Sequence, residues 1–230
     1  MSIGIPKLKV PLTCQMRNED LDLETTTFWI TVKERLFMER VIFLSGIINN
    51  SKANGICALM LFLNSLSDDF DDILDDSDDI LLYINSRGGE ARAAITIYDI
   101  MNSLVLDVNT LVTGLAASSA SLILSGGTIG KRAAFPNARI TIHQPVAGPF
   151  SGPPHILASE AEGMLELRNT IATIYAQTTG NLLRVVQKDL EREKYMSATE
   201  AQAYGIIDHV TEPADKTKPI ERDISNLGWH

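Results

Sequence analysis

Short apolar runs alternate with segments of helical periodicity along most of the chain, and this alternation restricts the fold more than any other feature. Residues 80–84 form a continuous apolar run of the kind found in strands that are buried on both faces of a sheet. Residues 91–104 follow with apolar side chains at helical spacing, and residues 108–112 form the next apolar run. Strands that alternate with helices pair in parallel and are joined by right-handed crossovers. The sequence therefore predicts an α/β fold.

The same patterns predict the remaining elements. Helices are expected at residues 28–39, 53–66, 156–178 and 182–191, in a small-residue segment ending at Leu124, and behind a capping box at residues 197–200 that opens a helix to Tyr204. Strands are expected at residues 41–44, 131–135, 139–142 and 206–207, with a turn at residues 85–89 and a Gly/Pro-rich loop after His143. Residues 1–27 show no clear period and are expected to form an irregular arm.

The composition excludes several classes of protein. The chain has 230 residues with 45% hydrophobic residues, which is typical of a globular protein of one large domain, or two. Its net charge of −9 comes mainly from one segment, because eight acidic residues lie within residues 68–79. The rest of the chain is nearly neutral, with 20 basic and 21 acidic residues. No basic stripe for nucleic acid is present. The two cysteines and four unclustered histidines make a disulfide framework or metal site unexpected. We see no signal or transit peptide and no membrane span.

Three short motifs at predicted strand ends carry the candidate chemistry. Ser118 lies among small residues where a strand passes into a helix, the setting that a serine nucleophile needs, although a helix cap is the simpler interpretation. Gly88 and Gly89 follow an apolar strand and would let backbone N–H groups approach an oxyanion, or form only a tight turn. His143 ends a strand and could act as a general base, or be structural. Together the three are more specific than any one alone, because sites gather at one edge of an α/β sheet.

A catalytic triad also needs a carboxylate that orients the histidine. The residues that follow His143 offer four carboxylates, at Asp189, Glu191, Glu193 and Asp208. The residue pattern alone does not choose among them.

At this point a family resemblance becomes specific. The segments Leu-Leu-Tyr-Ile-Asn-Ser-Arg-Gly-Gly (81–89), Gly-Leu-Ala-Ala-Ser (114–118), Ile-His-Gln-Pro (142–145), Met-Ser-Ala-Thr-Glu-Ala (196–201) and Gly-Ile-Ile-Asp (205–208) resemble, in this order, the Clp protease proteolytic subunit. The resemblance spans residues 28–210. The opening residues 1–7 and the segment 200–203 look like the plastid-encoded member.

The resemblance implies a Clp protease/crotonase-like fold, with a head domain and a protruding handle helix at about residues 156–178. It implies an ATP-dependent serine endopeptidase of the chloroplast stroma that cleaves unfolded proteins inside two stacked heptameric rings. A hexameric AAA+ ATPase would consume the ATP, and this subunit would need no cofactor. On this chain the implied catalytic residues are Ser118, His143 and Glu193, and the implied oxyanion donors are the N–H groups of Gly89 and Ser119. Gly88, Gln144 and Pro145 would bind substrate, and the strand after His143 would line the channel.

Several residues depart from the family pattern. Glu193 stands where the family has an aspartate, which adds a methylene to the third member of the triad. Arg87 replaces the usual proline of the turn before Gly88, so the loop loses a fixed φ. Ser119 and Ala120 replace the residues that usually follow the nucleophile. Ser103 stands in place of an aromatic residue of the ATPase-docking cleft, whose other aromatic, Tyr83, is kept.

The resemblance divides the chain into an N-terminal arm (1–27, the axial loop region), a peptidase domain (28–212) with an acidic insertion at 67–79, and a polar tail (213–230). The insertion is either a solvated loop or an acidic patch that meets a basic partner. Two alternative functions stay open at this point. One is a structural ring subunit with weakened or lost catalysis, and the other is an acyl-CoA enzyme of the related crotonase fold, against which the order of Ser118 and His143 argues.

Overall fold

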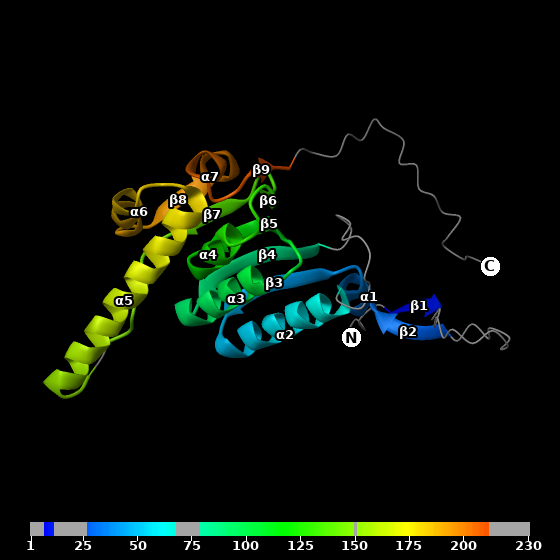
Figure 1. Ribbon diagram of the computed structural model, residues 1–230, viewed down its shortest axis with the longest axis horizontal. Coiled ribbons are helices and arrows are strands. Elements are labelled where there is room, and N and C mark those ends of the chain that lie inside the picture. Colours follow the sequence, from blue (N-terminus) through cyan, green and yellow to red (C-terminus); the bar gives the residue numbers. More distant parts are fainter. Residues whose placement is uncertain (1–6, 12–26, 68–78, 150, 212–230) are drawn as a thin grey trace, which may run out of the picture.

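The computed structural model describes residues 7–11, 27–67, 79–149 and 151–211. Its centre is a seven-stranded sheet (Figure 1). The sheet order runs through β3 (Val41–Ile48), β4 (Ile80–Gly89), β5 (Val108–Ala117), β6 (Arg132–Ala134) and β9 (His209–Val210), all paired in parallel. The C-terminal part of β5 also pairs in parallel with β7 (Arg139–Ile142), after the part that pairs with β6. Strand β7 in turn pairs antiparallel with β8 (Lys194–Ser197). The predicted α/β class is confirmed.

Helices pack in sequence against this sheet and against one another. Contacts run from α2 (Asn50–Ser67) to α3 (Ala91–Ser103), then to α4 (Ser119–Ser125) and α5 (Pro154–Thr179), which also contacts α6 (Leu183–Leu190). Figure 1 shows α5 extending away from the rest of the molecule. Residues 154–162 of this helix are exposed, and only its C-terminal half contributes buried side chains. The predicted helix at residues 156–178 is therefore confirmed, and its N-terminal half projects from the rest of the molecule.

Several predicted boundaries are wrong. The N-terminal segment is not irregular throughout, because β1 (Lys7–Pro11) pairs with β2 (Thr27–Thr31). The predicted helix at residues 28–39 begins only at α1 (Val32–Met38), since β-branched and aromatic residues precede it and Thr31 forms a capping box with Glu34. Residues 206–207 are buried without forming a strand. The strand expected after His143 is absent from residues 143–149 and 151–153.

The strands that lead to the candidate site are longer than their apolar runs. Residues 47–48 belong to β3, residues 85–89 continue β4 instead of turning, and β5 runs on to Ala117. The extension of β4 is held by pairing of Gly88 and Gly89 with Ile47 and Ile48 of β3, which hydropathy does not reveal. The carboxyl ends of β4, β5 and β7 therefore reach the same edge of the sheet.

The buried core is mostly apolar, and among the described residues Arg132 is the only charged side chain in it. Arg132 is 5% exposed at its side chain and donates two hydrogen bonds to the Asp208 carboxylate, at 2.6 and 2.9 Å. Arg132 also binds the carbonyl of Thr178 at the end of α5. Burial alone would raise the pKa of Asp208, but the Arg132 guanidinium and backbone N–H groups hold that pKa below its usual range. This pair joins β6, β9 and the base of α5.

Most of the acidic insertion and the C-terminal tail lie outside the described residues. Asp79, the last residue of the insertion, is described, and its carboxylate binds the Lys131 ammonium at 2.5 Å. Asp107 binds the same ammonium at 2.9 Å. Among the described residues, no helix is long and apolar enough to cross a membrane.

Candidate active site

Ser118 occupies the turn between β5 and α4 in an unusual backbone conformation. Its φ of 56° and ψ of −127° lie in a region that non-glycine residues rarely adopt. The backbone N–H of Ser118 donates to the carbonyl of Thr141 at 2.9 Å, so β7 holds the turn in place. Such strain persists only where surrounding structure imposes it, and it clusters at functional sites. The conformation therefore favours the nucleophile over the simple helix cap, and Ser118 makes no capping hydrogen bond.

Gly88 and Gly89 lie directly against this turn. Gly88 has a φ of 87°, and a Cβ there would stand 2.5 Å from the Ala117 carbonyl and 2.9 Å from the Ser118 Cβ. A Cβ on Gly89 would stand 2.0 Å from the Ile48 carbonyl. Both positions therefore require glycine. The N–H of Gly89, one of the expected oxyanion donors, donates to the Ser119 hydroxyl at 2.8 Å.

His143 follows the last residue of β7 and shares a cavity with Ser118. This cavity of about 640 Å³ is lined by Gly89, Ser118, His143 and Pro145, among others. The His143 Nδ1 lies 2.6 Å from the carbonyl oxygen of Gln144. Because a carbonyl oxygen only accepts, Nδ1 carries the proton, and Nε2 of the neutral ring is left as the base. This is the tautomer in which a histidine can accept a proton from a serine hydroxyl.

All four candidate carboxylates have described partners other than His143. Asp189 binds the Lys194 ammonium at 2.9 Å, Glu191 faces Arg168, and Asp208 binds Arg132. Glu193 immediately precedes β8 and His143 immediately follows β7. Because Ile142 pairs with Lys194 in antiparallel register, the two residues lie at the same end of this strand pair. Strand pairing thus favours Glu193 among the four carboxylates that the residue pattern alone left open.

The triad is nevertheless open in this structure. Among the described residues, no hydrogen bond joins His143 to Ser118 or to Glu193. The Glu193 carboxylate instead accepts a hydrogen bond from the Tyr195 hydroxyl at 2.5 Å, and this contact raises the pKa of Tyr195. Both side chains are exposed. Closing the triad therefore requires Glu193 to exchange Tyr195 for His143.

The sequence did not reveal the buried residues whose hydrogen bonds hold the Ser118 turn. The buried Ser121 hydroxyl lies within hydrogen-bond distance of the carbonyls of Ser118 and Thr141, at 2.6 and 2.9 Å, and of the Tyr175 hydroxyl at 2.8 Å. Tyr175 belongs to α5, so the projecting helix is linked to the Ser118 turn. No local motif marks Ser121 or Tyr175. Tyr195 also carries no motif of its own, and only its contact with Glu193 in the structure draws attention to it.

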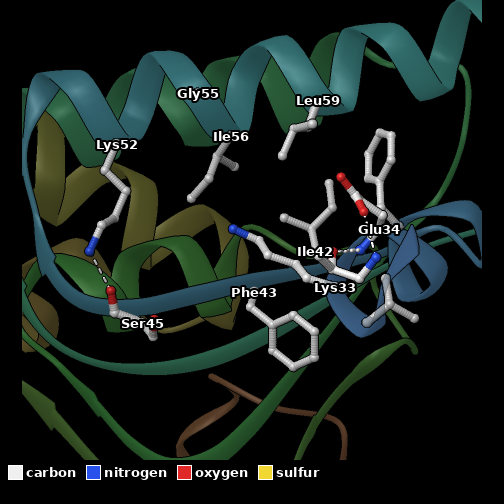
Figure 2. Close-up of a pocket in the computed structure, with 12 residues that line it drawn as sticks. Lys33, Glu34, Ile42, Phe43, Ser45, Lys52, Gly55, Ile56 and Leu59 are labelled. Atoms are coloured by element: carbon white, nitrogen blue, oxygen red, sulfur yellow. Dashed lines mark hydrogen bonds between the residues drawn. The ribbon is translucent and has the colours of Figure 1, made fainter. Parts of the chain in front are cut away.

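A second cavity, of about 680 Å³, lies between α1, β3 and α2 and shares no lining residue with the first. Figure 2 shows the ammonium groups of Lys33 and Lys52 directed toward the space between α2 and β3, with Ile56 and Leu59 on its wall. It contains none of the residues expected to be catalytic. Among the described residues, no group of three or more His, Cys, Asp or Glu side chains could hold a metal ion.

Comparison with known proteins decides the family. Residues 24–214 match the family described as Clp protease. The chain belongs to the Clp protease family. It is 44% identical over 210 residues to the "ATP-dependent Clp protease proteolytic subunit" of Anthoceros angustus, covering 91% of this chain and 95% of that protein. It is similarly 43% identical over 210 residues to the protein of the same description from Marchantia polymorpha, with the same coverage. With that of Huperzia lucidula it shares 41% over 222 residues, covering 96% and 98%.

Membership makes the chain a Clp-type proteolytic subunit, a serine peptidase, and removes the acyl-CoA alternative. The sheet and its parallel pairing agree with the fold of this family. Clp proteolytic subunits use no cofactor of their own. The chain is similar to these relatives over nearly their whole length.

Proposed function

We propose that Ser118, His143 and Glu193 are the catalytic triad of this Clp protease subunit, with Gly89 and Ser119 as oxyanion donors. The observation that carries the proposal is the strained Ser118 turn, which shares one cavity with His143 and Gly89 at the ends of three neighbouring strands. Gly88 and Pro145 border this site, and Gln144 contributes its backbone, which donates to Leu190 and accepts from His143. These three residues would bind the substrate chain.

The mechanism follows from the tautomer of His143. The Ser118 hydroxyl oxygen attacks the peptide carbonyl carbon while its proton passes to Nε2 of His143. The carbonyl oxygen becomes an oxyanion that faces the N–H groups of Gly89 and Ser119. Nε2 then gives its proton to the departing amine, which leaves an ester on Ser118. Water attacks this ester, again losing its proton to Nε2, and the proton returns to Ser118 as the carboxylate product leaves.

The carboxylate of Glu193 would stabilise the imidazolium that forms during these steps. Glu193 and His143 lie at the same end of the paired strands β8 and β7, and the extra methylene of Glu193 relative to aspartate lengthens the reach of its side chain. A turn of the imidazole away from the Gln144 carbonyl would bring Nδ1–H to this carboxylate. The open state that the structure describes then corresponds to a resting enzyme.

The proposal extends to assembly. As part of an ATP-dependent Clp protease, this subunit would join stacked heptameric rings and receive unfolded protein from a hexameric AAA+ ATPase. Two features support this. The N-terminal half of α5 projects without covering the core, and apolar side chains on β3 and α2 are exposed, namely Phe43, Ile47, Leu61 and Phe62. Phe43 stacks on Tyr83, the retained aromatic of the docking cleft, at 5.4 Å. We place the complex in the chloroplast stroma, because its opening residues resemble the plastid-encoded member and its relatives are land-plant proteins.

The alternative is a ring subunit whose catalysis has weakened. The engagement of Glu193 by Tyr195 and of the Gly89 N–H by Ser119 favours it. Peptide hydrolysis by the assembled complex separates the two functions when only this subunit carries Ser118→Ala. An active subunit predicts a fall in the rate with assembly unchanged. An unchanged rate would contradict the active interpretation.

A further inference from the structure

The expected oxyanion hole already contains an oxygen atom. The Gly89 N–H donates to the Ser119 hydroxyl oxygen at 2.8 Å, a full-length hydrogen bond between two segments that are 30 residues apart. Ser119 directly follows the nucleophile, and its side chain is buried at 7% exposure. The hydroxyl therefore occupies the acceptor position at one of the two N–H groups that would face the substrate oxyanion.

This contact competes with catalysis. An N–H group has one hydrogen, so a full-strength bond to Ser119 leaves no equal bond for a second oxygen at Gly89. Stabilisation by an oxyanion donor is strong, because removal of one donor lowers kcat by about 100- to 1,000-fold in a serine protease. A neutral hydrogen bond is much weaker in net terms, about 0.5 to 1.5 kcal/mol. Developing charge on a substrate can therefore displace the hydroxyl, at the cost of that smaller energy.

The hydroxyl has room to leave. Among the described residues, Ser119 makes no other side-chain hydrogen bond, so no second partner holds it in the hole. A cavity of about 20 Å³ borders Ser118, Ser119 and Leu122, next to Tyr175. One water-sized group needs roughly 10 to 15 Å³, so rotation of a single hydroxyl fits the space. A Cβ on Gly88 would stand only 3.1 Å from the backbone nitrogen of Ser119, so the two backbone segments lie close together, and rotation of the Ser119 side chain need not move either of them.

We infer that the Ser119 hydroxyl is an internal occupant of the oxyanion hole, which keeps the resting site closed until the substrate carbonyl displaces it. This inference rests on the proposed roles of Ser118 and Gly89. Ser119 acts through the Gly89 N–H and is therefore a positioning residue. Ser119, which replaces the residue that usually follows the nucleophile, would thus slow acylation without removing any member of the triad.

The test is the rate at which a fluorophosphonate modifies Ser118 in the assembled complex, followed by mass spectrometry of this subunit. Phosphonylation places an oxygen in the hole, so Ser119→Ala should react about 2- to 12-fold faster, the range that corresponds to one net hydrogen bond. Ser119→Cys, a weaker acceptor, should be intermediate.

Two controls separate this effect from a structural one. Ser125→Ala removes another buried hydroxyl of α4, one that donates only to Leu122 and is remote from Gly89, and it should not change the rate. Modification of His143 by diethyl pyrocarbonate needs no oxyanion hole and should be equal in the parent and in Ser119→Ala.

Each result is decisive. Faster phosphonylation of Ser119→Ala alone supports the inference. An unchanged rate overturns it and leaves the proposed function intact. A slower rate would show that the hydroxyl is itself an oxyanion donor, which also overturns it. Absence of any label at Ser118 in the parent complex would instead contradict the proposed function.

Discussion

Replacement of Gly88 by alanine should disable the site by moving the nucleophile. The added Cβ would stand 2.5 Å from the Ala117 carbonyl and 2.9 Å from the Ser118 Cβ, whereas ordinary contact begins at 3.4 Å. The Ser118 turn must therefore retreat by about 0.5 to 0.9 Å, the shortfall in those two distances. Misplacement of a reacting group by about 1 Å can cost about 100-fold in rate. We expect Gly88→Ala to lower the phosphonylation rate of Ser118 by roughly 10- to 100-fold.

The matched control is Gly130→Ala. Gly130 has nearly the same φ, 88°, but a Cβ there meets nothing within 4 Å. Both variants bear the cost of a left-handed alanine, about 1 to 2 kcal/mol of stability, and only Gly88→Ala also displaces Ser118. Mass spectrometry of labelled Ser118 gives the rate, and thermal unfolding gives the shared loss of stability. Equal labelling rates in the two variants would refute the assignment of Gly88 as the support of the nucleophile.

Three further results are expected. Tyr195→Phe removes the hydroxyl that binds the Glu193 carboxylate, so the rate of peptide hydrolysis should rise. Glu193→Gln should lower the same rate. A fall in the rate with Tyr195→Phe would count against Glu193 as the third triad member. Asp208→Asn leaves the buried Arg132 without its charged partner, so the unfolding free energy in denaturant should fall by about 3 kcal/mol, and a loss below about 1 kcal/mol would contradict the role of this pair. The pKa of Asp208 is lowered by folding, so its contribution is complete above the unfolded pKa of about 4 and is lost as pH falls below it; parent stability should decline there more steeply than that of Asp208→Asn.

The sequence predicted the order of the elements well and the ends of several strands poorly. Apolar runs located β4 and β5, but they stop at Ile84 and Val112, whereas the strands continue through polar and small residues to Gly89 and Ala117. Pairing with a neighbouring strand maintains these extensions, and a single segment carries no signal for it. The segment before Val32 shows the opposite error. Helical spacing predicts a helix from residue 28, but the helix begins only after its N-cap, Thr31, and the residues before it form a strand.

The sequence nominates a set of candidate site residues but does not give their geometry. Ser118, Gly89 and His143 could be nominated because each lies at or just after the end of a strand, and parallel strands bring their carboxyl ends to one edge. The choice of Glu193 needed the family resemblance or the register of β7 and β8, since residue type alone admits four carboxylates. The Ser119 contact could not be predicted from sequence, because it depends on the rotamer of one side chain beside a residue 30 positions away.

The central claim is that Ser118 of this subunit is a competent nucleophile activated by His143. The most direct measurement is peptide mapping of this subunit after the assembled complex has reacted with a fluorophosphonate. We predict an adduct on Ser118 that is absent from Ser118→Ala and strongly slowed in His143→Ala, with assembly intact in both. A complex that cleaves peptides and yet forms no adduct at Ser118 would contradict the claim.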